Sequence, residues 1–139
     1  MIALKQHSYN YLTTMNFKID TKEIFNVISI NEENLTANMA VDLLSLIAEK
    51  QKEANKSLII QMEAVMEIEE AAIESLVQIH ERMYKQKCSF VLCGLSPNVK
   101  AAMNKKDLLE KINNTPTESE AWDIVQMEEI ERELDMDFE

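Results

Sequence analysis

Two short and almost wholly apolar runs, "SLIIQM" (residues 57–62) and "CSFVLC" (residues 88–93), constrain the fold of this chain most strongly. Each run is too short and too apolar for a surface helix, which indicates a strand that is covered on both faces. Between them, apolar side chains recur at helical spacing and predict a helix over residues 70–86. A strand, a helix and a second strand in this order predict an α/β domain with a mostly parallel sheet.

The flanking segments extend this alternation of strands and helices. "FKIDTKEIFNVISI" (residues 17–30) contains two alternating apolar runs, which predict an opening hairpin or a bent edge. Thr36 is a candidate N-cap for a helix over residues 36–52, whose apolar residues again recur at helical spacing. We expect the strands "FNVISI", "SLIIQM" and "CSFVLC" to be neighbours in one sheet, with the helices 36–52 and 70–86 packed on it.

Three further signals lie in the second half of the chain. Ser96 can cap a short helix in which Pro97 takes the first position. "EKINNT" (residues 110–115) is a weaker strand candidate, and Thr117 with Glu120 offers a capping box for a last helix. Trp122 of that helix should lie against the sheet or a neighbouring helix. Its replacement by alanine should cost ~3–5 kcal/mol if the ring is fully buried, and under ~1 kcal/mol if it lies on the surface.

The size and the net charge of the chain limit the kinds of protein that it can be. The 139 residues fit one domain, and a content of 46% hydrophobic residues is far from the signature of disorder. A formal net charge of −11 argues against nucleic acid and anionic membranes, because phosphate surfaces are bound through Lys and Arg. The sequence shows neither a membrane-spanning apolar run nor a secretory signal, so we expect a cytoplasmic protein.

The sequence contains few residues in patterns typical of catalytic, nucleotide-binding or metal sites. One glycine is too few for a P-loop or a dinucleotide fingerprint, and neither His7 nor His80 belongs to a ligand pattern. Cys88 and Cys93 should point to opposite faces of a strand and remain buried, reduced thiols. We therefore expect no enzymatic activity, no catalytic residue, no metal site and no cofactor.

A cluster of glutamates follows "SLIIQM", at the turn where an α/β domain usually keeps its functional residues. A helix N-terminus carries a partial positive charge and unpaired N–H groups, so carboxylates are stabilised there. The cluster has two interpretations. Its members either only favour the start of the helix, or they form a surface that a partner recognises.

From about Phe17 to Val125, the order of elements resembles a STAS domain, the sulfate transporter and anti-sigma factor antagonist family. The resemblance is strongest from "SLIIQM" to "LSPNVK" (residues 95–100), because typical members place an apolar strand, a D-S-S-G-like turn, a helix, a second strand and V-S-P-x-V-[KR] in this order. It implies an α/β fold with a four- to five-stranded mixed sheet and helices packed mainly on one face. It further implies a domain over residues 16–127, between an N-terminal arm (1–15) and an acidic C-terminal extension (128–139).

The resemblance also implies a function. Typical members bind a protein partner at the turn before the second major helix, often a serine-kinase-type anti-sigma factor, and phosphorylation of a serine in the turn releases that partner. Counting back from Ser96 without gaps places the family's acidic position on Glu69 and its phosphoacceptor on Glu70. The serine is thus missing, and Glu70 either imitates phosphoserine or only favours the helix start.

These considerations predict a non-catalytic, protein-binding regulator similar to an anti-sigma factor antagonist, acting in partner switching and transcription regulation. The alternative is an accessory STAS subunit of an ABC-type lipid-trafficking transporter. The residues predicted to bind the partner lie in the turn and in adjacent loops: Glu67, Glu69, Glu70, Ala71, Ala72, Glu74, Asn34, Ser96 and Pro97.

Overall fold

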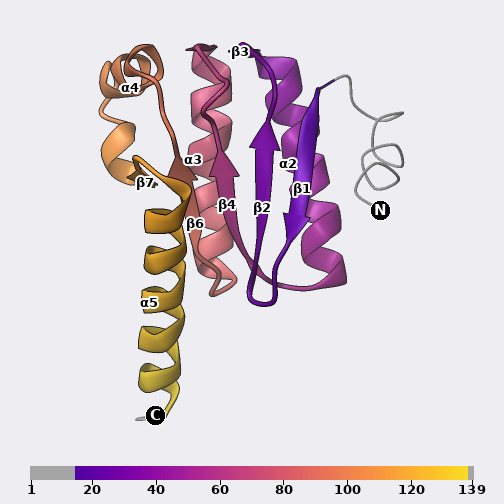
Figure 1. Ribbon diagram of the computed structural model, residues 1–139, viewed down its shortest axis with the longest axis vertical. Helices are drawn as coiled ribbons and strands as arrows, with labels where there is room; N and C mark the ends of the chain where they lie inside the picture. The colour runs from indigo at the N-terminus through magenta and orange to yellow at the C-terminus, as the bar shows by residue number, and fades with distance from the viewer. Residues whose placement is uncertain (1–14, 138–139) are drawn as a thin grey trace.

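The computed structural model describes residues 15–137, which are built around a five-stranded sheet (Figure 1). Its strands are, in spatial order, β1 (Phe17–Thr21), β2 (Phe25–Ile30), β4 (Ser57–Gln61), β6 (Phe90–Cys93) and β7 (Asn113–Thr115). β1 and β2 form the predicted antiparallel hairpin, and each later pair of neighbours is parallel. The runs "FNVISI", "SLIIQM" and "CSFVLC" form β2, β4 and β6, which are neighbours in this mixed sheet. This confirms the predicted arrangement.

Helices cover the two faces of the sheet unequally. α2 (Ala37–Glu53) and α3 (Glu70–Lys85) lie together on one face, where α4 (Pro97–Asn104) and the 3-10 turn η1 (Leu109–Lys111) continue the layer (Figure 1). α5 (Glu118–Asp137) packs on the opposite face, and its C-terminal half runs past the end of the sheet (Figure 1). Most helices thus share one face, as expected.

The predicted helix starts are formed by side-chain oxygens that accept backbone N–H groups. Thr36 Oγ1 accepts from the N–H of Met39 at 3.2 Å, and Ser96 Oγ accepts from the N–H of Val99 at 3.2 Å. Thr117 Oγ1 accepts from the N–H of Glu120 at 3.3 Å. Each bond satisfies a donor that the first turn of a helix leaves without an intrahelical partner.

The alternation of side chains along the strands divides the interior into two apolar clusters. Ile60 of β4 joins the larger cluster beneath α2 and α3, whereas its neighbour Ile59 joins a smaller cluster beneath α5. Cys88 lies in the larger cluster and Cys93 in the smaller one, and both are reduced and buried, as predicted.

Trp122 packs at the edge of the smaller cluster, with its ring edge-on to Phe25 at a centroid distance of 5.2 Å. The ring lies against the sheet as predicted, but it is only partly buried, neither fully buried nor on the surface.

The proposed division of the chain remains a prediction. α5 runs without interruption through residues 127 and 128, where the acidic extension was expected to begin. Almost all of the N-terminal arm, including His7, lies outside the described residues. Within the described residues, no helix has both the length and the apolar character needed to cross a membrane.

Candidate functional site

The glutamate cluster lies at the edge of the sheet where the parallel strands end, and a second, small sheet organises it. β3 (Asn34–Leu35) and β5 (Glu67–Ile68) pair in parallel and join the loop after β2 to the loop after β4. The carbonyl of Glu33 accepts from the N–H groups of Met66 and Glu67, at 2.7 and 2.9 Å. The two loops are therefore held together immediately before α3 begins.

Gly94 follows the last residue of β6 and lies against the turn after β4. Its φ of 72° lies in the left-handed region, and a Cβ atom there would stand 2.5 Å from Gln61 Oε1. That oxygen accepts the N–H of Glu63 at 3.0 Å, so a side chain at residue 94 would displace the group that shapes the turn after β4. The left-handed conformation favours glycine here, and any side chain would also disturb the hydrogen bond between Gln61 and Glu63.

Glu69 occupies the N-cap position of α3, but its carboxylate does not cap that helix. Glu69 Oε1 accepts instead from the N–H of Ala37, the first residue of α2, at 2.7 Å. The side chain therefore links the starts of two helices and places negative charge at the positive end of α2. This differs from the simpler expectation that Glu69 favours the start of its own helix.

Glu70 lies in the first turn of α3, and its exposed carboxylate forms an ion pair with Lys106, just beyond α4. The hydrogen bond to Glu70 raises the pKa of Lys106, and the charges of Glu70 and Glu74 act in the same direction. Lys106 is therefore fully protonated at neutral pH. Both side chains are more than half exposed, so the pair is accessible and adds little to stability.

An open pocket of about 340 Å³ lies beside this ion pair, between the start of α3 and α4. Ile68, Ile73 and Leu108 supply apolar lining, whereas Glu70, Lys105 and Lys106 supply charge. An apolar pocket with a few charged groups at its margin is suited to receiving a side chain from a partner.

The structure brings the predicted partner-binding residues to one edge of the molecule. Asn34 pairs with Glu67 in the small sheet, and α4, which begins with Ser96 and Pro97, packs against β5 and α3. The exposed members of the set are Asn34, Glu67, Glu69, Glu70, Ala71, Glu74 and Pro97. Ala72 is fully buried, so it can only let the helix start pack closely and cannot itself offer surface to a partner.

The residues with potential for chemistry lie away from this arrangement. The His80 ring contacts Tyr84 and Phe90 with centroid distances of 4.5 and 6.2 Å, in the second half of α3. Burial raises the pKa of the Cys93 thiol to about 12, so this thiol stays protonated and is a poor nucleophile. In the part of the chain that the structure describes, no group of three or more His, Cys, Asp or Glu side chains could hold a metal ion.

The basic side of the site was not predicted from the sequence. Lys105 and Lys106 follow α4 in "MNKKDLLE", which shows no motif, and Lys106 is separated from Glu70 by 36 positions. The only available signal was a pair of lysines within a strongly acidic chain. The site is therefore not a purely acidic patch but a glutamate cluster with a lysine pair beside its pocket.

Comparison with known proteins identifies the fold family. The family model described as "STAS domain" matches residues 17–121, about three quarters of the chain. No curated protein matches the sequence at a significant level.

Solved structures of similar fold include both regulators and a transporter. The anti-sigma factor antagonist SpoIIAA in its unphosphorylated form is 16% identical, with a TM-score of 0.67 over 80% of this chain and 96% of that chain. RsbS from Moorella thermoacetica, in a variant with glutamate in place of a serine, is 18% identical, with a TM-score of 0.68 over 80% and 95%. The murine anion transporter Slc26a9 is 17% identical, with a TM-score of 0.62 over 88% of this chain but only 20% of the transporter.

Proposed function

This chain belongs to the STAS domain family, and from that premise we propose that it is a non-catalytic regulator that binds another protein through the start of α3. The fold is shared with anti-sigma factor antagonists, which supports a regulatory role. The same fold within an anion transporter means that fold alone does not define the partner.

The observation that carries this proposal is the accessible pair of Glu70 and Lys106 beside an apolar pocket. The pocket can receive an anchoring side chain, and the two opposite charges at its margin can exchange their mutual ion pair for contacts with a partner. Glu67, Glu74 and Asn34 extend the exposed surface around it. Ser96 contributes by fixing the start of α4 through its cap.

In this proposal Glu70 replaces the serine that typical family members phosphorylate. A carboxylate carries one negative charge, whereas a phosphate carries about −1.5 to −2 and offers three acceptor oxygens, so the imitation is partial but permanent. Lys106 holds this charge at the margin of the pocket. The protein would remain in one binding state, without the switch that phosphorylation provides.

We propose a serine-kinase-type anti-sigma factor in the cytoplasm as the partner, because the fold is shared with anti-sigma factor antagonists. The net charge of −11 disfavours nucleic acid as a ligand. The alternative role, as an accessory subunit of an ABC-type lipid-trafficking transporter, would use the same surface for a different protein. A neighbouring permease and ATPase in the genome would favour the transporter role, and a kinase-like ATPase or a phosphatase would favour partner switching.

Affinity capture followed by calorimetry tests this proposal. Wild-type protein and Glu70→Ala are each used to retrieve a partner from the lysate of its source organism, because an imitation of phosphoserine would leave wild type in the weakly binding state. The recovered protein is titrated with wild type, Glu70→Ser and Glu70→Ala. If Glu70 imitates phosphate, both substitutions strengthen binding to a kinase-type partner, and only Glu70→Ser makes binding sensitive to ATP. If Glu70 only favours the helix start, both variants lose less than ~1 kcal/mol of stability and their affinities equal that of wild type.

Glu81→Ser is the matched control, because Glu81 is also an exposed glutamate of α3 but lies well after its first turn. It should bind the partner like wild type. Equal affinities for wild type and both Glu70 variants would contradict the imitation of phosphate. Recovery of neither an anti-sigma factor nor a transporter protein would contradict the proposed function.

A further inference from the structure

α5 exposes a row of apolar side chains that the fold leaves uncovered. Met127, Ile130 and Leu134 are 59%, 57% and 52% exposed, respectively. Because they are three and four residues apart, they lie on one side of the helix on successive turns. Single exposed apolar residues are ordinary, but a continuous row on a protruding helix marks an interaction surface. We call these three residues the α5 stripe.

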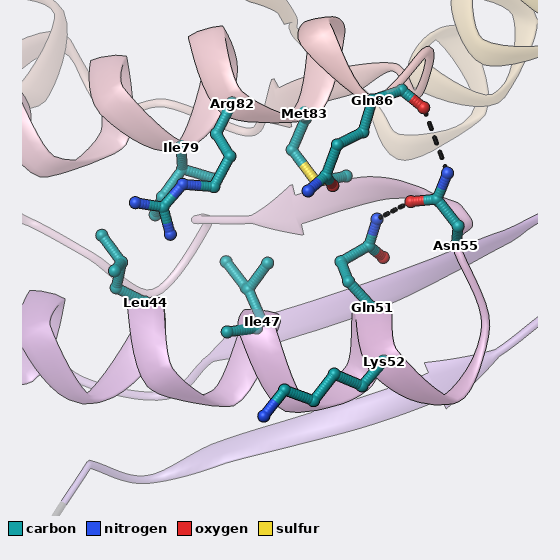
Figure 2. Close-up of a pocket in the computed structure, with 10 residues that line it drawn as sticks. Leu44, Ile47, Gln51, Lys52, Asn55, Ile79, Arg82, Met83 and Gln86 are labelled. Atoms are coloured by element: carbon teal, nitrogen blue, oxygen red, sulfur yellow. Dashed lines mark hydrogen bonds between the residues drawn. The ribbon is translucent and has the colours of Figure 1, made fainter.

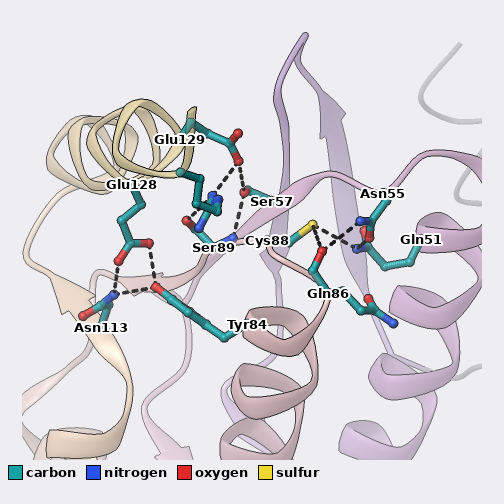
Figure 3. A network of polar contacts seen from close by, with 11 residues as sticks. Gln51, Asn55, Ser57, Tyr84, Gln86, Cys88, Ser89, Asn113, Glu128 and Glu129 are labelled. Atoms are coloured by element: carbon teal, nitrogen blue, oxygen red, sulfur yellow. Dashed lines mark hydrogen bonds and ion pairs between the residues drawn. The ribbon is translucent and has the colours of Figure 1, made fainter. Parts of the chain in front are cut away.

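A network of polar contacts holds the opposite side of α5 against the sheet and Tyr84 (Figure 3). Tyr84 Oη donates to Glu128 Oε1 at 2.6 Å, and Ser57 Oγ donates to Glu129 Oε1 at 3.1 Å. Arg132 donates to Ser89 Oγ at 3.0 Å and to Glu129 Oε1 at 2.6 Å. These bonds fix the rotation of the helix, so the α5 stripe is directed away from the protein's own interior.

The surroundings of the α5 stripe are acidic. Asp123, Glu131, Glu133 and Asp135 are all exposed on the same helix. Arg132 is the only basic residue of α5, and its contacts turn it toward the sheet. Two α5 stripes placed face to face would therefore bring like charges together, which disfavours symmetric pairing of this helix. A surface that covers the stripe should be apolar with a basic margin.

The same chain presents such a surface on its other face. α2 and α3 enclose an open groove of about 530 Å³, with Leu44 and Ile47 from one helix and Ile79 and Met83 from the other (Figure 2). Its charged lining residues, among those that the structure describes, are Lys52 and Arg82, and none is acidic. Figure 2 shows the Arg82 side chain extending toward the Leu44 side of the groove. We call this the α2–α3 groove.

We infer that the α5 stripe of one copy docks into the α2–α3 groove of a second copy. Leu44 is half-buried and Ile47, Ile79 and Met83 form the buried floor of the groove, so the stripe would meet an apolar floor. The acidic margin of α5 would face the two cations of the groove, and this charge complementarity favours a second copy as the occupant. Within one copy the sheet stands between the two surfaces, so the contact must be made between copies. The alternative occupant in the chain, residues 1–14, contains Lys5 and no acidic residue, and so offers the groove no complementary charge.

This contact is heterologous, because one copy contributes the helix and the other copy contributes the groove. Copies joined in this way leave a free helix and a free groove at the ends, so the assembly grows with concentration or closes into a ring. Two differently damaged copies should therefore complement one another: the intact helix of one fits the intact groove of the other, and growth stops at a dimer.

Sedimentation velocity on the full chain over a range of concentrations tests the inference. Ile130→Glu damages the stripe. Ala48, on α2, also lines the groove, so Ala48→Glu combined with Arg82→Glu damages the groove. All three positions are exposed, so the fold should persist. Each variant alone should lose about an order of magnitude or more in self-affinity. An equimolar mixture should form dimers that grow no further. Ile24→Glu, at the exposed tip of the β1–β2 hairpin, is the matched control and should assemble like wild type.

The other outcomes overturn the inference. Loss of assembly in Ile130→Glu alone would indicate a symmetric contact between α5 helices. Loss in both variants without recovery on mixing would exclude the pairing of stripe with groove. If wild type stays monomeric at every concentration, a second copy does not occupy the groove, and its occupant would be residues 1–14 or another protein. Circular dichroism and melting of each variant must match wild type, which separates lost assembly from lost folding.

Discussion

The two faces of the sheet are stabilised differently. On one face, α2 and α3 pack side by side over a continuous apolar layer that includes Leu43, Leu76 and Phe90, each fully buried. On the other face, α5 covers a small cluster around Ile59 and Val91 and is held further along by polar contacts to Tyr84, Ser57 and Ser89. The difference shows that apolar burial builds the first face, whereas position-specific polar bonds orient the second.

The two faces also differ in what they contribute: the first mainly stabilises the fold, and the second leaves a surface available for interaction. The first face holds most of the buried apolar surface, so it should contribute most of the stability. The second face carries a helix whose outward side is available, because its own packing uses only the opposite side. Substitutions on the two faces should therefore differ in how much stability they cost.

The largest effect should come from a matched pair within β4. Ile60 and Ile59 are adjacent and fully buried, but they point to opposite faces. Ile60→Ala should cost close to the upper end of about 2–5 kcal/mol, because α2 and α3 are fixed by their surroundings and the cavity persists. Ile59→Ala should cost close to the lower end, because a single helix can shift into the space.

Urea denaturation of both variants measures this difference. The free energies of unfolding are compared with the same m-value, the slope of the free energy against urea concentration. Wild type is the common reference, and the same residue type in the same strand removes differences in transfer energy and strand propensity. Equal losses of stability, or a larger loss for Ile59→Ala, would contradict the expected difference between the two faces.

An intermediate effect is expected at Trp122, where α5 meets the sheet. Its ring packs edge-on to Phe25, and the amino group of Lys22 lies 5.3 Å from the ring centroid. Because the ring is only partly buried, Trp122→Ala should cost about 2 kcal/mol, below the ~3–5 kcal/mol of a fully buried aromatic residue. Thermal and urea denaturation measure the change. Trp122→Phe, as the control, should recover most of the loss, and a cost below ~0.5 kcal/mol would place the ring outside the α5 contact.

The smallest effect should appear with pH at His80, where the two faces meet near Tyr84. Burial lowers the pKa of His80, and this outweighs the charges of Glu128 and Glu81 and a backbone hydrogen bond, which raise it. Below the unfolded pKa of about 6.5, the unfolded chain then binds the proton more readily than the folded one. Stability contributed by neutral His80 is therefore present above that pH and declines as the pH falls.

Urea denaturation of wild type and His80→Gln at pH about 7 and about 5.5 isolates this contribution, because His7 and all carboxylates are common to both proteins. Wild type should lose more stability than the variant on acidification. Identical losses would show that His80 titrates normally and that the junction between the faces is more solvated than its contacts indicate.

The fold could be predicted from the sequence wherever the signal was local. Apolar runs identified β4 and β6, and the caps at Thr36 and Ser96 were visible because the hydroxyl and its helix are a few residues apart. β3 and β5 were not predicted, since two residues of a strand carry no periodicity. Their existence depends on two loops that meet only in the folded chain.

The site was predictable in position but not in its contacts. The glutamates and the order of elements identified the start of α3, whereas the role of Glu69 depends on Ala37 and that of Glu70 on Lys106. Each of these pairs is separated by more than thirty positions, and exposed charges follow no pattern that reveals their partners. The same reason kept the polar network of α5 hidden, because Tyr84 and Glu128 belong to different helices.

The order of strands in the sheet has a consequence for synthesis on the ribosome. Strands β1, β2, β4, β6 and β7 lie in space in the same order as in the chain. Each newly made strand can thus pair with one that has already left the exit tunnel, and no gap must be kept open for a later segment. A domain made from its N-terminus can grow in this way by edge addition, with α5 arriving last to cover a sheet that is already assembled.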